Sequence, residues 1–348
     1  MRGKRKEEHI NIALHSQDGP NTNGFEEVYL LHHSLPELSM EEIDLSCEFL
    51  GKKLNLPLVL NAITGGTPRA EDINYHLACI AKKYGMAMAV GSQTISIDDP
   101  GSASTFRIVR EINPTGVIIA NMGAGRPVED ALAAVEMINA DALQLHFNVP
   151  QELAMREGDR SFKGIIDNVA RIVKECPVPV IAKEVGFGFS RESVSLLYGA
   201  GVNIIDVGGM GGTNFIVIED KRGGMFGGEL DNWGIPTAQS LAEVLSLGLP
   251  LTVIASGGIR TALDAAKALA MGADLVGIAG SFLKVLLREG ADVLDNVVAN
   301  MVYRLKAVFL MTGADNIERI KTRPVIITGR TGEWLKLRGI NPEWWARR

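Results

Sequence analysis

The chain has 348 residues, of which 46% are hydrophobic, and its formal net charge at pH 7 is −6. This composition is typical of a globular protein with a sizeable core. The mildly acidic balance argues against general nucleic-acid binding, which needs clustered Lys and Arg. No apolar run approaches the ~20 residues of a membrane-spanning helix, and the basic start is not followed by the apolar stretch of a secretory signal.

The cysteines form no pairing motif. They stand far apart in the sequence, without a C-x-x-C spacing, at Cys47, Cys79 and Cys176. A disulfide framework is therefore not expected. The protein is expected to reside in a reducing compartment. We predict a cytoplasmic protein that contacts neither nucleic acid nor a membrane.

Eight short apolar runs recur along the chain, separated by helical patterns. Most are apolar throughout, as in parallel strands that are covered on both faces. The runs begin at Leu56, Met86, Gly116, Ala142, Pro177, Val202, Leu251 and Asp274. Eight alternating units over about 230 residues favour a (β/α)₈ TIM barrel over an open, doubly wound sheet.

We therefore predict one barrel domain over residues 1–348. It would consist of an N-terminal arm over residues 1–55, the barrel over about 56–285, and C-terminal helices over 286–348. The tail ends in NPEWWARR, where Trp344 and Trp345 have the character of exposed interface residues. Packing of these rings on the protein's own barrel is the alternative.

Catalytic groups of TIM barrels lie just after the strands. Polar side chains occupy such positions after nearly every predicted strand, which is more than helix capping alone would require. They are Asn61, Thr64, Ser92, Gln93, Asn121, His146, Asn148, Lys183, Glu184, Thr213 and Ser256.

The last two predicted strands end in small residues, in SGGIR (Ser256 to Arg260) and GIAGSF (Gly277 to Phe282). Loops at these two places often bind phosphate in TIM barrels, because glycines let backbone N–H groups approach the oxygens and a helix N-terminus adds positive potential. Tight turns that merely need glycine are the alternative. The occurrence of both loops predicts a phosphate site, which by itself names no reaction.

Lys183 follows a buried predicted strand, in VIAKEVG. A lysine in a barrel mouth needs an anionic partner, because burial of its charge alone is costly. A flavin would supply negative charge near N1 and O2 of its reduced ring, and FMN would also supply the phosphate. A neighbouring carboxylate is the alternative partner. We infer FMN from the two signals together.

The stretch QLHFNVPQE, Gln144 to Glu152, follows the fourth predicted strand. One His, one carboxylate and two amides are too few and too hard for a zinc site. A single carboxylate suits Mg²⁺ that takes its other ligands from water and substrate phosphates. His146, Asn148 and Gln151 can donate hydrogen bonds to the same anion.

Over nearly its full length the chain resembles the FMN-dependent type 2 isopentenyl diphosphate isomerases. The resemblance rests on RKEEHI, NAITGG, GSQ, QLHFNVPQE, AKEVGFG, DVGGMGGTNF and SGGIRTALDAAKALAMGAD. It implies an enzyme that interconverts isopentenyl and dimethylallyl diphosphate with FMN, Mg²⁺ and NADPH as the reductant of the flavin. It also implies a homo-oligomer, a tetramer or an octamer.

The resemblance assigns roles residue by residue. His146, Gln151 and Lys183 would be catalytic, and Glu152 would bind Mg²⁺. The residues that would bind substrate are Arg5, Lys6, Ser92, Gln93, His146, Asn148 and Gln151. Those that would bind FMN are Ala62, Ile63, Thr64, Ser92, Asn121, Lys183, Thr213, Gly257, Gly258, Arg260, Ala279 and Gly280.

Two positions depart from the family's pattern. Ile63 stands where the family usually has Met, which is a mild change beside the flavin ring. Gly208 stands where the family often has Ser, so a hydroxyl that would contact flavin is lost, and Gly208 is not assigned to the site. The implied reaction has no net redox change: the reduced flavin would act as acid and base, and its electron-rich ring would stabilise a cationic transition state.

Three other functions are weaker fits. An FMN oxidoreductase of the hydroxy-acid oxidase kind, acting on a small phosphorylated or hydroxy-acid substrate, needs a base, generally His, late in the barrel. All six histidines here lie at or before His146. A nucleotide dehydrogenase of the IMP type needs a cysteine where GMGGTNF offers Thr213. A non-catalytic phosphate-binding scaffold leaves the polar groups without a joint purpose.

The segment from Glu219 to Thr237 makes the longest interval between successive predicted strands. Gly223, Gly224, Gly227 and Gly228 favour flexibility, while Trp233 offers a ring to bury. Long structureless loops in compact domains are usually lids or disordered. We predict a lid that closes over flavin and substrate. Glu229 could bring a polar group near the site but is given no catalytic role.

Overall fold

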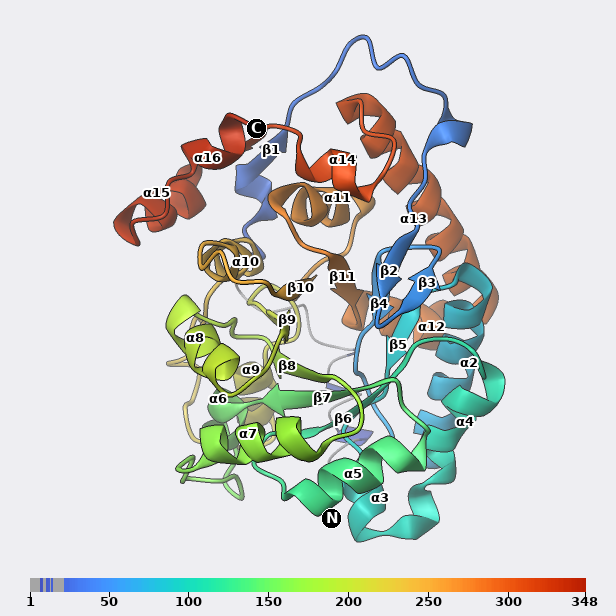
Figure 1. Ribbon diagram of the computed structural model, residues 1–348. Coiled ribbons are helices and arrows are strands. Elements are labelled where there is room, and N and C mark those ends of the chain that lie inside the picture. Colours follow the sequence, from blue (N-terminus) through green and yellow to red (C-terminus); the bar gives the residue numbers. More distant parts are fainter. Residues whose placement is uncertain (1–6, 9–10, 13, 15–21) are drawn as a thin grey trace.

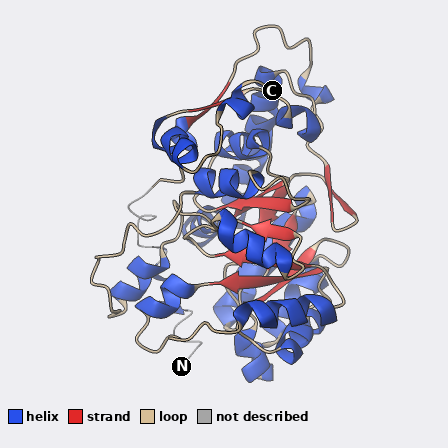
Figure 2. Cartoon of the chain, turned by 60° about the vertical axis from the view of Figure 1, so that its left-hand side comes forward, coloured by secondary structure: helices blue, strands red, loops and turns tan. Residues whose placement is uncertain are grey.

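The computed structural model describes residues 7–8, 11–12, 14 and 22–348. Eight parallel strands close into a barrel, in which β11 returns to pair with β4. Figures 1 and 2 show these strands at the centre with helices around them. The strands are β4 (Leu58–Leu60), β5 (Ala87–Ala89), β6 (Ile118–Gly123), β7 (Ala142–Phe147), β8 (Val180–Glu184), β9 (Ile204–Asp206), β10 (Thr252–Ser256) and β11 (Leu275–Ile278). The predicted TIM barrel is confirmed, and each predicted apolar run contains one strand.

The outer helices pack against the strands through their apolar faces. The helix after β4 begins after Thr67, whose hydroxyl accepts from the backbone N–H of Ala70, and ends at Gly85 in the left-handed conformation. These helices are α2 (Pro68–Tyr84), α4 (Ser104–Ile112), α5 (Val128–Met137), α7 (Ile165–Glu175), α8 (Arg191–Gly199), α10 (Thr237–Leu245), α11 (Ala262–Met271) and α12 (Gly280–Glu289). Three shorter helices lie in the loops after the strands: α3 (Thr94–Asp98), α6 (Val149–Ala154) and α9 (Phe215–Lys221).

The segments before and after the barrel pack together. β1 (Val28–Leu30) pairs antiparallel with β12 (Val325–Ile327), which lies between α14 (Ile317–Lys321) and α15 (Gly329–Leu337). The long helix α13 (Ala291–Thr312) and the last helix α16 (Glu343–Ala346) complete the tail. Of the two rings expected to be exposed, Trp344 is, but Trp345 is not. Trp345 is buried, and its indole N–H donates to the carbonyl of Met271, so this ring packs on the protein's own barrel.

The inside of the barrel has an apolar lower layer and a polar upper one. The hairpin of β2 (Cys47–Phe49) and β3 (Lys52–Leu54) places Phe49 and Leu54 in a buried cluster with Val59, Ile181 and other inward residues of the strands. Nearer the carboxyl ends of the strands the inward side chains become polar. This polar layer is the floor of the site described below.

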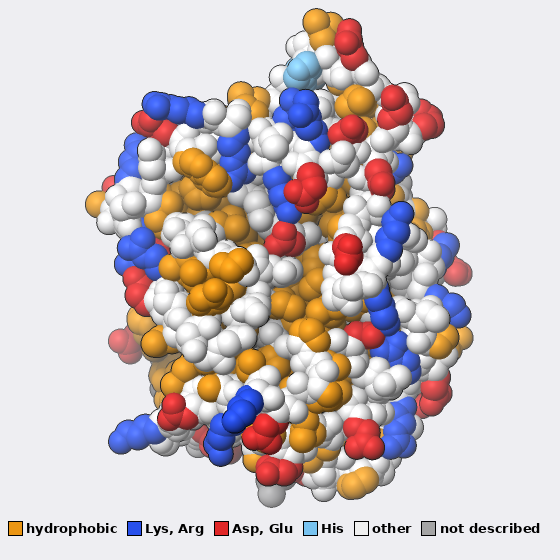
Figure 3. Space-filling model, in the orientation of Figure 1, with side chains coloured by type: hydrophobic (Ala, Val, Ile, Leu, Met, Phe, Trp, Pro, Cys, Tyr) orange, Lys and Arg blue, Asp and Glu red, His pale blue; other side chains and the backbone are white. Residues whose placement is uncertain are grey.

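Charges are interspersed over the face that Figure 3 shows, where Lys and Arg alternate with Asp and Glu rather than gathering in a basic stripe. No helix among the described residues is long and apolar enough to cross a membrane.

Candidate active site

A cavity of about 700 Å³ opens at the carboxyl ends of the barrel strands. Most residues expected at the site line it: Ala62, Ile63, Thr64, Ser92, Asn121, His146, Asn148, Gln151, Glu152, Lys183, Thr213, Gly257, Gly258, Arg260, Ala279 and Gly280. Closure of the barrel brings them together from the ends of all eight strands and the loops that follow. Arg5 and Lys6 lie outside the described residues.

Among the described residues to which the resemblance assigns a role, Gln93 is the exception. Its side chain is fully buried and does not line the cavity. The amide donates to the carbonyl of Ala134 at 2.9 Å and accepts from the backbone N–H of Asn121 at 3.0 Å. Gln93 therefore holds the strand end that carries Asn121, and no contact of its side chain with a ligand follows from this arrangement.

Asp206 lies beneath the floor of the cavity, which it does not itself line, and is the common partner of several floor residues. Its carboxylate is fully buried at the end of β9 and accepts from Asn61 Nδ2 at 2.6 Å, Gln144 Nε2 at 3.2 Å and Lys183 Nζ at 3.1 Å. The hydroxyl of Ser256 also donates to it. Burial of this charge is tolerable because donors surround it.

Lys183 thus has a carboxylate partner of its own. The side chain is 9% exposed, and its ammonium contacts both Asp206 and Ser256, at 3.1 and 3.2 Å. The sequence argument held that this lysine needs an anionic partner and inferred a bound FMN as that ligand. The structure supports the alternative, because Asp206 compensates the charge without one. Lys183 still lines the cavity, so its contact with a flavin stays a prediction.

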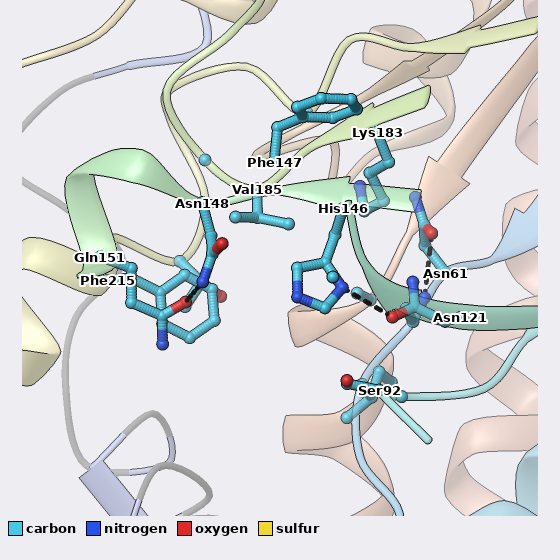
Figure 4. A pocket seen from close by; sticks show the side chains of 18 of the residues that line it. Asn61, Ser92, Asn121, His146, Phe147, Asn148, Gln151, Lys183, Val185 and Phe215 are labelled. Atoms are coloured by element: carbon cyan, nitrogen blue, oxygen red, sulfur yellow. Dashed lines mark hydrogen bonds between the residues drawn. The ribbon is translucent and has the colours of Figure 1, made fainter. Parts of the chain in front are cut away.

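The loop after β7 carries a second group of polar residues. α6 begins directly after Asn148, whose amide donates to Glu152 Oε1 at 2.8 Å. Glu152 Oε2 accepts from the backbone N–H of Asp159 at 3.0 Å, and Gln151 donates to the buried Glu219 at 3.2 Å. Figure 4 shows Asn148, Gln151 and Phe215 on one side of the cavity and His146, Asn121 and Asn61 on the other.

The described residues contain no group of three or more His, Cys, Asp or Glu that could hold a metal ion. Glu152 therefore does not belong to a ready-made set of three or more such ligands among the described residues. A metal held here would take most of its ligands from water and from a bound anion, as Mg²⁺ commonly does.

The loops after β10 and β11 form the glycine-lined end of the cavity. Gly257 and Gly258 have φ values of 111° and 68°, which side chains rarely adopt, and a Cβ on either would lie within 2.3 Å of a backbone carbonyl oxygen. Arg260 braces the loop by donating to the carbonyls of Gly258 and Gly211. α12 begins beside it, so its first N–H groups face the same space.

Two buried hydroxyls in the cavity wall have no hydrogen-bond partner among the described residues: Thr64 Oγ1 and Ser281 Oγ. Buried polar groups are nearly always satisfied, so each of these oxygens calls for a ligand or water. Ser281 lies at the glycine-lined end and Thr64 at the end of β4. The residues present therefore fit a long ligand with a phosphate at one end, such as FMN.

Sequence reasoning missed several residues of the cavity wall. Gly208 was left out for lack of a hydroxyl, yet it lines the cavity with φ 47°, and a Cβ there would lie 1.7 Å from the carbonyl oxygen of Glu184. Arg126 follows β6, so the rule that site residues stand just after the strands could have found it. Lys163 and Phe162 lie in the loop after α6, where no pattern in the sequence marked them.

Glu184 lies next to Lys183 but points away from the cavity lining. It is fully buried, and burial raises the pKa of its carboxyl to about 8, although the backbone N–H groups of Phe187 and Gly188 donate to it. Its role is to hold the turn after β8.

The pH dependence of stability should reveal Glu184. Because its pKa is raised from 4.5 in the unfolded chain to about 8, its contribution is complete below about pH 4.5 and is lost as the pH rises through 8. We expect Glu184→Gln, which keeps an acceptor for the turn, to flatten the fall in stability between pH 5 and 8, a change of up to about 3.5 kcal/mol. Urea unfolding at both pH values measures it. Glu318→Gln, at an exposed carboxylate, is the control, and equal slopes for Glu184→Gln and wild type would contradict the expectation.

The comparisons with known proteins agree with one another. The pattern of the FMN-dependent dehydrogenase family matches residues 150–327. The isopentenyl-diphosphate delta-isomerase of Symbiobacterium thermophilum is 48% identical, over 98% of this chain and 97% of its own. That of Moorella thermoacetica is 50% identical, over 96% of each. The chain belongs to the isopentenyl-diphosphate delta-isomerase family.

The fold is also that of solved flavoprotein oxidases. A mandelate oxidase variant with an FMN adduct aligns with a TM-score of 0.69, over 92% of this chain and 96% of its own, at 16% identity. Mandelate oxidase with (S)-4-hydroxymandelic acid aligns over 93% and 98%, with the same TM-score, at 15% identity. At such identities the likeness shows the shared barrel alone, whereas the delta-isomerase family matches in sequence along nearly the whole chain.

Proposed function

We propose that this protein interconverts isopentenyl and dimethylallyl diphosphate in isoprenoid biosynthesis, with FMN as its cofactor and Mg²⁺ on the diphosphate. The observation that supports this most strongly is the 48–50% identity to delta-isomerases over almost the whole chain. The cavity adds a glycine-lined end for a phosphate, two unsatisfied hydroxyls, and a rim of amides with one carboxylate.

The glycine loops after β10 and β11, with Ser281, would hold the FMN phosphate, and Thr64 would contact the flavin nearer its ring. Reduced FMN, when bound, supplies an electron-rich ring able to exchange protons without net redox change. Lys183 would lie beside that ring and favour its anionic reduced form. NADPH is the proposed source of the reducing equivalents.

The opposite side of the cavity would hold the substrate. Asn148 and His146 would donate to the diphosphate, while Glu152 would bind Mg²⁺ between itself and the phosphate oxygens. Such a clamp would hold the substrate in one orientation and limit loss of diphosphate as a leaving group. Gln151, which lines the same side of the cavity, would take part in moving a proton.

An anaerobic assay tests the proposal. Isopentenyl diphosphate, FMN, Mg²⁺ and NADPH are mixed with the purified protein, and dimethylallyl diphosphate is measured. We expect product, and expect none when FMN or Mg²⁺ is omitted. Oxygen consumption with lactate or mandelate and no isomerisation would instead favour the oxidase function of the structural relatives.

We also propose a cytoplasmic homo-oligomer, a tetramer or an octamer. The three cysteines are free, as in proteins of reducing compartments. Light scattering of the purified protein gives its mass, and a monomer at assay concentration would contradict the oligomer.

The predicted lid over residues 219–237 is more ordered than expected. The expectation of a structureless interval is wrong at both ends, because Glu219 lies within α9 and Thr237 begins α10. Between them Asp220 accepts from the backbone N–H groups of Phe226 and Gly228. Trp233, the ring that the segment offers for burial, is 60% exposed.

We still propose that the loop after α9 closes over a bound ligand, since its exposed Trp233 would gain burial on closure. Limited proteolysis at the four glycines should be fast in the free protein and slow with FMN, Mg²⁺ and substrate together. A second digest with FMN alone separates the effect of the cofactor from that of the substrate. Equal rates in all three states would mean that the loop does not close.

A further inference from the structure

A row of buried side chains connects Asp206 to His146 across the cavity floor. Gln144 is fully buried, with Nε2 at 3.2 Å from Asp206 Oδ2 and Oε1 at 2.8 Å from Asn121 Nδ2. Asn121 Oδ1 in turn lies 3.0 Å from His146 Nδ1. Each member of the row thus contacts the next through one hydrogen bond.

The direction of these hydrogen bonds is set at the Asp206 end. The groups that converge on Asp206 are all donors: the amides of Asn61 and Gln144, the ammonium of Lys183, the hydroxyl of Ser256 and the backbone N–H of Gly208. A carboxylate only accepts, so Gln144 must turn its nitrogen toward it and its oxygen away. The opposite orientation would bring two acceptors together in a buried place. Its population would be lower than that of the favoured orientation by a factor on the order of ten or more.

The same rule carries the direction onward. The oxygen of Gln144 accepts from the nitrogen of Asn121, so the oxygen of Asn121 faces the imidazole. The backbone N–H of Asn121 is held by Gln93, whose side chain is anchored on Ala134, so this strand end is fixed in place. Because Asn121 offers only an acceptor, His146 must bring a proton on Nδ1.

We propose that Asp206 is a positioning residue: acting through two intervening amides, it holds the proton of neutral His146 on Nδ1. The other ring nitrogen, Nε2, points to the side of the cavity where Asn148 and Gln151 lie (Figure 4). Any further proton that the ring takes up must then go to Nε2, the nitrogen that faces the ligand. The tautomer follows from the described side chains alone; its use, donation to a diphosphate, rests on the proposed function.

Nitrogen NMR tests the tautomer directly. The full chain is labelled with ¹⁵N-histidine and measured near pH 8.5, about two units above the ordinary histidine pKa, and the His146 signals are assigned by their loss in His146→Gln. We expect a protonated Nδ1 and an unprotonated Nε2. Dominance of the Nε2–H tautomer in the wild-type protein would overturn the proposal.

Two variants test the part played by Asp206. In Asp206→Leu the acceptor that orients Gln144 is removed, so both amides of the row can reverse. In Gln144→Leu the pair of Asp206 and Lys183 is kept but the row is cut. We expect the Nε2–H tautomer to gain at least tenfold in population in either variant. Should Asp206→Leu fail to fold, Gln144→Leu decides alone.

Ser256→Ala is the matched control, because it removes another donor to Asp206 and leaves the row of amides intact. Its His146 signals should match those of the wild-type protein. A folded Gln144→Leu with wild-type tautomer, or a change in Ser256→Ala as large as that in Gln144→Leu, would overturn the proposal. The NMR measurement needs no turnover. The tautomer proposal and the isomerase proposal can therefore be contradicted independently of each other.

Discussion

Replacing Lys183 by Ala should lower both the stability of the fold and the protein's hold on flavin. The change leaves the carboxylate of Asp206 buried without its cation, a loss of about 3–5 kcal/mol by comparison with other broken buried pairs. Removal of a positive charge beside the ring should also weaken FMN binding and lower the reduction potential of the bound flavin. Urea unfolding measures the first effect, and a flavin titration with spectroelectrochemistry measures the second.

The two effects can be separated by a second variant. Lys183→Met combined with Asp206→Asn removes both charges of the pair, so much of the lost stability should return. The flavin defect should remain, because the cation is still absent. A double variant that regains flavin affinity and potential together with stability would show that Lys183 acts only through the fold and does not contact the cofactor.

The barrel was predictable because its strands are covered on both faces. Each strand is then a continuous apolar run, which separates it from the amphipathic helices around it. The strand-end rule also found most of the cavity, since it depends only on where a run stops. It could not find Lys163 or Phe162, which reach the cavity from a loop whose path depends on α6.

The floor of the site was not predictable from the sequence in the same way. Asp206 stands at the end of an apolar run, and its donors come from four other strands or their ends, so only closure of the barrel reveals it as their common partner. Gln93 shows the converse. It follows a strand as a site residue should, but its side chain turns toward Ala134 because α3 begins immediately after it.

Exchanging Glu152 for Gln should abolish most turnover while the fold and the flavin remain. The side chain lines the cavity, with Oε1 held by Asn148 and Oε2 by the backbone N–H of Asp159, so its position is fixed while its charge still faces the open space. Gln keeps one of these acceptors but not the charge that Mg²⁺ requires. We expect turnover to fall on the order of 100-fold or more, with the Mg²⁺ requirement raised or lost.

The dependence of rate on Mg²⁺ concentration separates a ligand from a residue that merely shapes the loop. Loss of a ligand moves the midpoint of the Mg²⁺ curve to higher concentration, whereas a shifted loop lowers the rate at every concentration and leaves the midpoint in place. Glu157→Gln is the matched control: this carboxylate is more than half exposed, pairs with Arg222 and does not line the cavity. Its midpoint should equal that of the wild-type protein. If Glu152→Gln shares that midpoint too, the metal is bound without Glu152, and the diphosphate itself must supply nearly all of the metal's non-water ligands.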